Sequence, residues 1–205
     1  GETMFDITIK NILANIWPML VIITVILSSL RVVYIIRNKE TFVLYREILK
    51  LGFVIYIMSL FYVVTFQDVS WSSSNFIPFK EMLRYRIFSN LFFKNVVGNM
   101  IMFLPYGFFT SYFLKLDRKK AIIYLSLLVS CTIEFTQLLI GRVFDVDDII
   151  LNVLGGLFGY FIYRFVYFVR DHLPKVLKNN IFYNIIVVII LSCIFYYIYT
   201  ILGAN

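Results

Sequence analysis

The sequence predicts an all-α integral membrane protein: a polytopic bundle of about six transmembrane helices with an amphipathic helix at the membrane interface. Composition is the first reason, because 61% of the 205 residues are hydrophobic, 15% are charged, and the mean hydropathy is +0.86. Soluble domains are nearer half apolar and a quarter charged. The second reason is a series of runs, almost free of charge, that reach the length of about 20 residues needed to cross the hydrocarbon core.

The predicted spans follow one another along the whole chain. They cover residues 12–36, 48–66, 95–114, 121–140, 149–169 and 181–202. The first run is too long for the apolar region of a signal peptide, and no cleavage site follows it, so we expect it to remain as a span. Residues 1–3 resemble a tag remnant, and we expect the natural chain to begin at Met4.

Basic residues predict the orientation of these spans. Most of the 19 Lys and Arg residues fall in or beside the loops at 37–50, 115–120 and 170–178. Cytoplasmic loops of membrane proteins are rich in Lys and Arg, so we expect these loops in the cytoplasm and both termini outside it. The net charge of +7 has the same explanation, and nucleic acid is therefore not an expected partner.

One segment between the predicted spans differs from both loop and span. Residues 79–94 space their apolar side chains as on one face of a helix, and the opposite face is basic. This pattern predicts an amphipathic helix that lies in the membrane interface. The turn-rich residues 71–78 connect it to the preceding span, and Trp71 is expected in an interfacial aromatic belt.

Polar side chains within the spans are the candidates for function, because charges and amides are costly inside a membrane. A spacing of three or four residues puts Asn95 with Asn99, and Glu134 with Gln137, on one helix face each, and the same spacing recurs within 145–152. Under the predicted orientation these stripes lie at the outer ends of their helices and are expected to line a shared, water-accessible cavity. The candidate ligand-binding residues are Asn95, Asn99, Glu134, Gln137, Arg142, Asp145, Asp148 and Asn152.

Structural roles are the alternatives for these residues. Asn side chains in membrane helices often bond to neighbouring helices. Asp147 or Asp148 can cap the fifth predicted span, and Arg142 is a candidate salt-bridge partner for Glu134. The glycines within 155–159 include a GxxxG step, which predicts close helix packing.

The motifs that contain these residues resemble the VanZ-like family. They read NFIPF at 75–79, NVVGN at 95–99, FLPYG at 103–107, EFTQ at 134–137 and DVDDIILNVLGG at 145–156. The resemblance covers about residues 75–163 and divides the chain into a two-span segment at 1–74, a VanZ-like core at 75–165, and a cytoplasmic loop with the last span at 166–205. The residues that match the family pattern are Asn95, Asn99, Pro105, Glu134, Gln137, Asp145, Asp148 and Asn152.

The resemblance implies a phenotype rather than a reaction. The founding member is associated with reduced susceptibility to teicoplanin, and related proteins with lipoglycopeptides, in Gram-positive bacteria. We expect a multi-pass protein of the bacterial cytoplasmic membrane that contacts membrane lipids. The first hypothesis for its function is that it binds a glycopeptide antibiotic or a lipid-linked cell-wall precursor at the outer face of that membrane.

Two further hypotheses stay open beside binding. The first is an intramembrane enzyme acting on a lipid-linked or peptidoglycan substrate, with Glu134 as acid and Asp148 or Asp145 as base. The second is a transporter, which is disfavoured because the ionisable residues gather near one surface rather than at the midplane. No cofactor or metal is expected, although Asp145, Asp147 and Asp148 are an alternative oxygen-rich site for Mg²⁺, Mn²⁺ or Ca²⁺.

Overall fold

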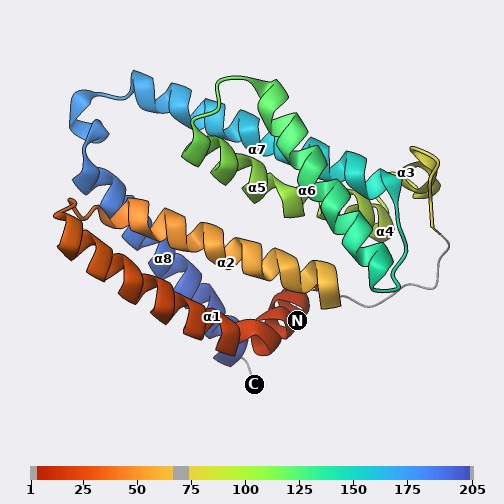
Figure 1. Cartoon of the computed structure of the whole chain (residues 1–205), viewed down its shortest axis with the longest axis horizontal. Coiled ribbons are helices and arrows are strands. Elements are labelled where there is room, and N and C mark those ends of the chain that lie inside the picture. Colours follow the sequence, from red (N-terminus) through yellow and green to blue (C-terminus); the bar gives the residue numbers. More distant parts are fainter. Residues whose placement is uncertain (1–3, 67–73, 204–205) are drawn as a thin grey trace. The chain divides into compact units, whose positions relative to one another are not determined.

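The computed structural model describes residues 4–66 and 74–203, and helices account for nearly all of them (Figure 1). Trp71 and residues 1–3 lie outside the described residues. The elements are α1 (Met4–Asn38), α2 (Leu44–Phe66), α3 (Lys80–Arg84), α4 (Asn90–Phe92), the π-helical turn η1 (Phe93–Val97), α5 (Gly98–Leu114), α6 (Lys119–Leu139), α7 (Val146–His172), the 3-10 turn η2 (Lys175–Lys178) and α8 (Asn180–Gly203).

The predicted spans are confirmed as helices. In the described part of the chain, six helices are long and apolar enough to cross a membrane. They cover Leu13–Asn38, Leu44–Thr65, Asn90–Leu114, Lys119–Leu139, Val146–His172 and Asn180–Thr200. Their ends differ from the predicted ends by a few residues, with the largest extension at the start of the third span. The protein is therefore an all-α membrane protein.

The chain divides into two compact units. Unit 1 comprises residues 1–63 and 172–205, and unit 2 comprises residues 64–171. Within unit 1, α8 contacts α1. Helix α8 also contacts the start of α2. The backbone N–H of Tyr45 donates to Asn184 Oδ1 over 3.0 Å, and the centroids of the Tyr45 and Tyr183 rings lie 5.4 Å apart. The last helix of the chain therefore completes the unit that the first helix begins.

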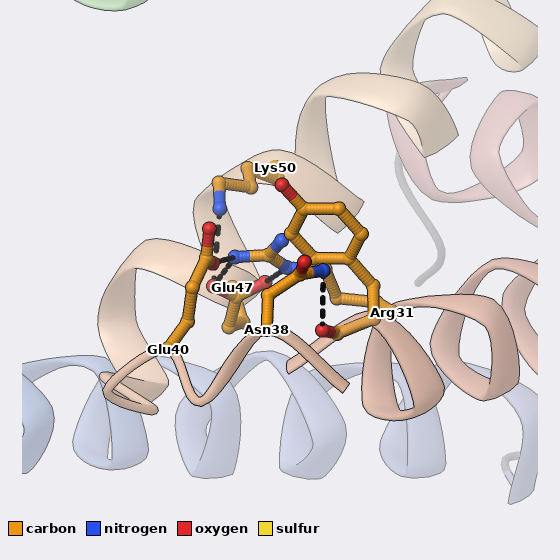
Figure 2. Close-up of polar contacts among 6 residues, drawn as sticks. Arg31, Asn38, Glu40, Glu47 and Lys50 are labelled. Carbon is orange, nitrogen blue, oxygen red and sulfur yellow. Dashed lines mark hydrogen bonds and ion pairs between the residues drawn. The ribbon is translucent and has the colours of Figure 1, made fainter. Parts of the chain in front are cut away.

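An ion-pair network joins α1 to α2 within unit 1 (Figure 2). Arg31 donates to Glu47 through Nε and Nη2 over 2.8 and 3.0 Å, and Nη2 also reaches Glu40 Oε2 over 2.8 Å. Lys50 donates to the same Glu47 over 3.0 Å. Bidentate, charge-assisted hydrogen bonds of this kind are stronger than bonds between neutral groups. Pairing also lowers the free-energy cost of placing charged side chains at the ends of membrane spans. An apolar hollow of about 530 Å³ lies beside this network, along α1 and α2.

Small residues let the helices of unit 2 approach one another closely. A Cβ atom at Gly107 of α5 would lie 2.6 Å from the carbonyl carbon of Gly156 in α7, and one at Gly159 would lie 2.6 Å from the backbone nitrogen of Phe108. A Cβ at Gly155 would likewise overlap the carbonyl of Met100. These overlaps confirm the packing role predicted for the glycines at 155–159, because only glycine permits this backbone contact.

The segment 79–97 differs from the single amphipathic helix that its periodicity predicts. Helix α3 ends at Arg84, and the following backbone is extended at Tyr85 and left-handed at Phe88, with φ of 65°. A new helix then begins at Ser89, whose hydroxyl accepts from the N–H of Phe92 over 3.1 Å as an N-cap. Local capping thus overrides the helical period, and the third span starts at Asn90.

Candidate functional site

The connector ahead of α3 is attached to the start of α7 by backbone and side-chain bonds of Asn75. Its N–H donates to Phe144 O over 2.8 Å, and its carbonyl accepts from Val146 N over 3.0 Å. The Asn75 amide also donates to Asp145 Oδ1 over 2.9 Å, and the residue is 3% exposed. This pairing fixes the connector against the segment that contains the acidic residues.

Asp147 secures the helix that follows this connector. Its carboxylate accepts from the backbone N–H groups of Phe79, Glu81 and Met82 over 2.5, 2.8 and 3.0 Å, and the residue is 1% exposed. An Asp carboxylate at this place fills the role of an N-cap for α3, although it comes from a distant part of the chain. Phe79 has the left-handed φ of 65°, a conformation that needs such external support in a residue with a Cβ.

Asp145, rather than Asp147 or Asp148, caps α7. Asp145 Oδ1 accepts from the N–H of Asp147 over 2.9 Å, the usual spacing of an N-cap bond. The capping alternative considered for Asp147 and Asp148 is therefore wrong for α7. Burial raises the pKa of the Asp145 carboxyl, and the hydrogen bond from Asn75 acts in the opposite direction.

Four predicted site residues come together from three helices. Glu134 of α6 is 2% exposed, and its Oε2 accepts from the backbone N–H of Asp145 over 3.0 Å. Asn99 of α5 donates to Asp148 Oδ1 at the start of α7 over 2.5 Å. We call Asn99, Glu134, Asp145 and Asp148 the acidic cluster. It places three carboxyl groups and one amide at one end of the α5–α6–α7 bundle.

Tyr85 adds a phenol beside the acidic cluster. The residue follows α3 directly and is half-buried. Burial raises the pKa of its hydroxyl, and the negative charges of Glu81, Asp145 and Asp148 act in the same direction, against Arg84. The phenol therefore keeps its proton and can act as a hydrogen-bond donor next to carboxylate acceptors.

The other predicted site residues lie beside the cluster and make different contacts. Gln137 Nε2 and Arg142 Nη1 both donate to the carbonyl of Val64, over 3.1 and 2.5 Å. The salt bridge considered between Arg142 and Glu134 is therefore replaced by a bond from Arg142 to the backbone. Asn95 lies in η1, one turn ahead of α5, and takes no part in these hydrogen bonds.

Asn152 forms a helix-to-helix contact deeper in the bundle. Its Nδ2 donates to Ser130 Oγ of α6 over 2.9 Å, and both residues are buried. In the described part of the chain, the Asn152 Oδ1 and Ser126 Oγ atoms are buried without a hydrogen-bond partner. The structural alternative considered for membrane asparagines therefore describes Asn152 well.

The arrangement favours hydrogen bonding over metal binding. Both carboxylate oxygens of Asp147 accept from backbone N–H groups, and Asp145 accepts from Asn75 and Asp147. In residues 4–66 and 74–203, no group of three or more His, Cys, Asp or Glu side chains has the arrangement of a metal site. The carboxylates of Asp145 and Asp147 thus hold backbone and amide groups in place.

Comparison with known proteins agrees with this architecture. The sequence model of the VanZ/LLP1 family matches residues 53–170, more than half of the chain. The chain belongs to the VanZ/LLP1 family. No curated protein and no solved structure matches the chain.

The VanZ/LLP1 match includes the whole acidic cluster and its supports. It runs from the middle of α2 to the end of α7, so it covers Asn75, Tyr85, Asp147 and the Val64 carbonyl as well as the four cluster residues. The match therefore begins earlier than the stretch of motif resemblance, within the second span. The part of the chain that holds the site is the part that the family shares.

Sequence reasoning missed two supports of the site and misassigned a third. Asn75 bonds to Asp145, 70 residues away in the chain, and Tyr85 lies within the electrostatic reach of Asp145 and Asp148, about 60 residues away. A helical period does not report such distant pairs. Asp147 was considered as a cap for its own helix or a metal ligand, whereas it caps α3. In the sequence, the NFIPF motif with its proline Pro78 was a local sign of a fixed turn, and the structure shows the left-handed Phe79 next to that proline.

Proposed function

We propose that this VanZ/LLP1 protein lowers the susceptibility of a Gram-positive host to teicoplanin and related lipoglycopeptides. It does so by binding the antibiotic or an envelope lipid precursor at the outer face of the cytoplasmic membrane. The acidic cluster is the binding site, and both chain termini lie on the same side of the membrane as the cluster. The observation that supports this proposal best is the convergence of Asn99, Glu134, Asp145 and Asp148 from three helices at one end of unit 2.

The chemistry of the cluster suits a ligand with sugar, peptide or amine groups. Carboxylates accept hydrogen bonds from hydroxyl, amide and ammonium donors, and the Tyr85 phenol can donate in return. Apolar side chains of α3 and the segment after it are open beside the cluster, with Leu83 82% and Phe88 81% exposed. An acyl chain can lie against these side chains while the polar part of the same molecule meets the carboxylates.

A second candidate is an intramembrane enzyme, favoured by the unequal burial of two carboxyl groups. Glu134 is 2% exposed, whereas Asp148 is half-buried at the helix start. Two carboxyl groups in unlike surroundings can serve as acid and base in one reaction, here on a lipid-linked or peptidoglycan substrate. Both candidates use the same residues, so one set of variants tests them together.

The direct test is teicoplanin susceptibility of a sensitive host that expresses the wild type, Glu134→Gln or Asp148→Asn at matched membrane levels. We expect the wild type to protect and both variants to lose protection, because each removes a charged acceptor. Loss of one charge-assisted hydrogen bond weakens ligand binding by about tenfold or more. Glu134→Gln keeps an oxygen that can accept from the N–H of Asp145, so the local fold is preserved.

Asp171→Asn is the matched control, since it removes an acid near the other end of α7. It should protect as well as the wild type. Full protection by all of the variants would contradict a role for the cluster in this phenotype. An unprotected wild type would show that the antibiotic phenotype does not extend to this protein.

The orientation has its own test by labelling of substituted cysteines. Cysteine replaces Phe76, beside the cluster, or Lys115, in the loop between α5 and α6, in a chain whose Cys131 and Cys193 are alanines. We expect a membrane-impermeant maleimide to label Phe76→Cys on intact cells, and Lys115→Cys only after the membrane is opened. The reverse pattern would place the acidic cluster in the cytoplasm and overturn the proposed site of action.

A further inference from the structure

A basic hollow lies at the end of unit 2 opposite to the acidic cluster. Its volume is about 480 Å³, and it is lined by Asp117, Arg118, Lys119, Lys120, Tyr160, Phe161 and Arg164. Arg164 follows Asp148 along α7 by more than four turns, which is about 24 Å along the helix axis. Two of its lining residues, Asp117 and Arg118, lie in the loop between one membrane span, which ends at Leu114, and the next, which begins at Lys119. It therefore belongs at the opposite membrane surface from the acidic cluster.

The charges around the hollow attract anions. Its lining holds four cationic side chains and one acidic side chain, that of Asp117. Arg164 Nη1 lies 3.6 Å from Asp117 Oδ1, but the Asp117 side chain is 89% exposed, and exposed pairs of this kind stabilise little. Arg164 is therefore available to a stronger anionic partner.

The start of α6 adds to this positive potential. Helix α6 begins at Lys119, and its N-cap residue Arg118 makes no side-chain capping bond. The first N–H groups of a helix carry partial positive charge and bind anions readily. The first two residues of α6, Lys119 and Lys120, line the hollow themselves, so the positive end of the helix and the cationic side chains act on the same space.

An apolar surface continues from the hollow along α7. The Tyr160 hydroxyl donates to the Asp117 carbonyl over 2.9 Å and fixes the floor of the hollow, with Tyr160 itself 5% exposed. Next to it, Phe161 and Phe158 are about half exposed, and Phe165 on the same helix is 66% exposed. A ligand with a phosphate group at one end and a hydrocarbon chain at the other matches a basic hollow that is followed by an apolar surface.

We propose that this hollow binds the phosphate headgroup of an anionic phospholipid. Arg118, Lys119, Lys120 and Arg164 contact the phosphate, and Phe161 lies against the first part of an acyl chain. Basic pockets between membrane helices, close to the membrane surface, bind anionic lipid headgroups in this way. The inference does not depend on the proposed antibiotic phenotype, because it concerns a different end of the molecule.

The test measures lipid binding to the full chain purified in a neutral detergent, by native mass spectrometry. Dioleoyl phosphatidylglycerol is titrated against dioleoyl phosphatidylcholine, which has the same chains and no net charge. We expect preferential binding of phosphatidylglycerol. The triple variant with Arg118, Lys119 and Lys120 changed to glutamine should lose affinity by about fivefold for each charge removed.

Two further variants separate a specific site from general charge or misfolding. The matched control changes Arg37, Lys39 and Lys175 to glutamine, which removes the same charge elsewhere, and should keep wild-type affinity. Asp117→Asn removes the acid from the hollow and should raise affinity by up to about fivefold, a gain that misfolding does not produce.

Three outcomes would overturn the proposal. Equal binding of the two lipids would show that charge is not recognised. An equal loss in the control triple variant would assign binding to overall charge rather than to the hollow. Displacement of phosphatidylglycerol by sodium phosphate at equal concentration would identify a site for free anions instead of a lipid.

Discussion

Replacing Asp147 with alanine is expected to release helix α3 and the connector before it from the start of α7. The Asp147 carboxylate accepts from three backbone N–H groups and is 1% exposed, so alanine leaves three donors without their partner. A hydrogen bond to a charged acceptor contributes about 1.5–3 kcal/mol, so we expect the loss of three part-buried bonds to cost this segment about 3 kcal/mol or more. Amide hydrogen exchange in residues 79–82 should therefore accelerate strongly, while exchange in the middle of α7 changes little.

Two other variants show whether this effect is specific. Glu81→Gln removes a carboxylate from the same segment but leaves the backbone N–H of Glu81 bonded to Asp147, so exchange should stay close to that of the wild type. Asp147→Asn keeps one acceptor oxygen and should give an intermediate rate. Unchanged exchange in Asp147→Ala would mean that α3 is held by its apolar contacts and not by the carboxylate.

Release of α3 has a consequence for the acidic cluster. Tyr85 follows α3 and is placed beside Asp145 and Asp148 by the end of that helix. A mobile α3 therefore removes the phenol from the cluster even though the Asn99–Asp148 bond stays in place. If Tyr85 contributes to ligand binding, Asp147→Ala reduces protection in the susceptibility assay without changing a residue that contacts the ligand.

The spans and the glycine contacts were predictable because both arise from short-range patterns. Six apolar stretches of sufficient length define six helices whatever their neighbours are. The glycines at 155–159 indicate a helix surface without side chains, and the structure places backbone atoms of α5 against that surface. The sequence did not predict which helix packs against these glycines, because the spacing of residues along one helix does not identify the neighbouring helix.

The acidic cluster was predictable in part. Distance from the span ends placed Asn99, Glu134 and Asn152 near one depth, and helical spacing put Asp145 and Asp148 on one stripe with Asn152. The structure brings Asn99, Glu134, Asp145 and Asp148 together, whereas Asn152 bonds deeper in the bundle. The continuous amphipathic helix at 79–94 was wrong as a single element, because Ser89 starts a new helix and Asp147 caps α3 from outside the segment. Both of these effects depend on side-chain bonds to the backbone, which a hydrophobic period does not register.

Replacing Gly107 with alanine is expected to force α5 and α7 apart. The new Cβ would overlap the carbonyl group of Gly156, with its carbon 2.6 Å away and its Cα 2.7 Å away. The overlapped atoms belong to the backbone of α7, and the Cβ has no freedom to rotate away from the backbone of α5, so the overlap is relieved only by a shift of a whole helix. Overpacking of this kind costs about 1–3 kcal/mol, and we expect the upper end of this range. The measurement is thermal unfolding of the purified chain in detergent, followed by circular dichroism.

Gly52→Ala is the matched control for this prediction. It makes the same change within helix α2, where nothing lies within 4 Å of the added Cβ, and should raise stability by about 0.5–1 kcal/mol through helix propensity. The Gly107 variant should also lose protection against teicoplanin. Asn99 and Asp148 lie on α5 and α7, and their bond of 2.5 Å requires the approach that the glycines allow. Equal stability of the two variants would show that the helices repack without a loss of stability. It would also show that the position of the acidic cluster does not depend on the glycine contacts.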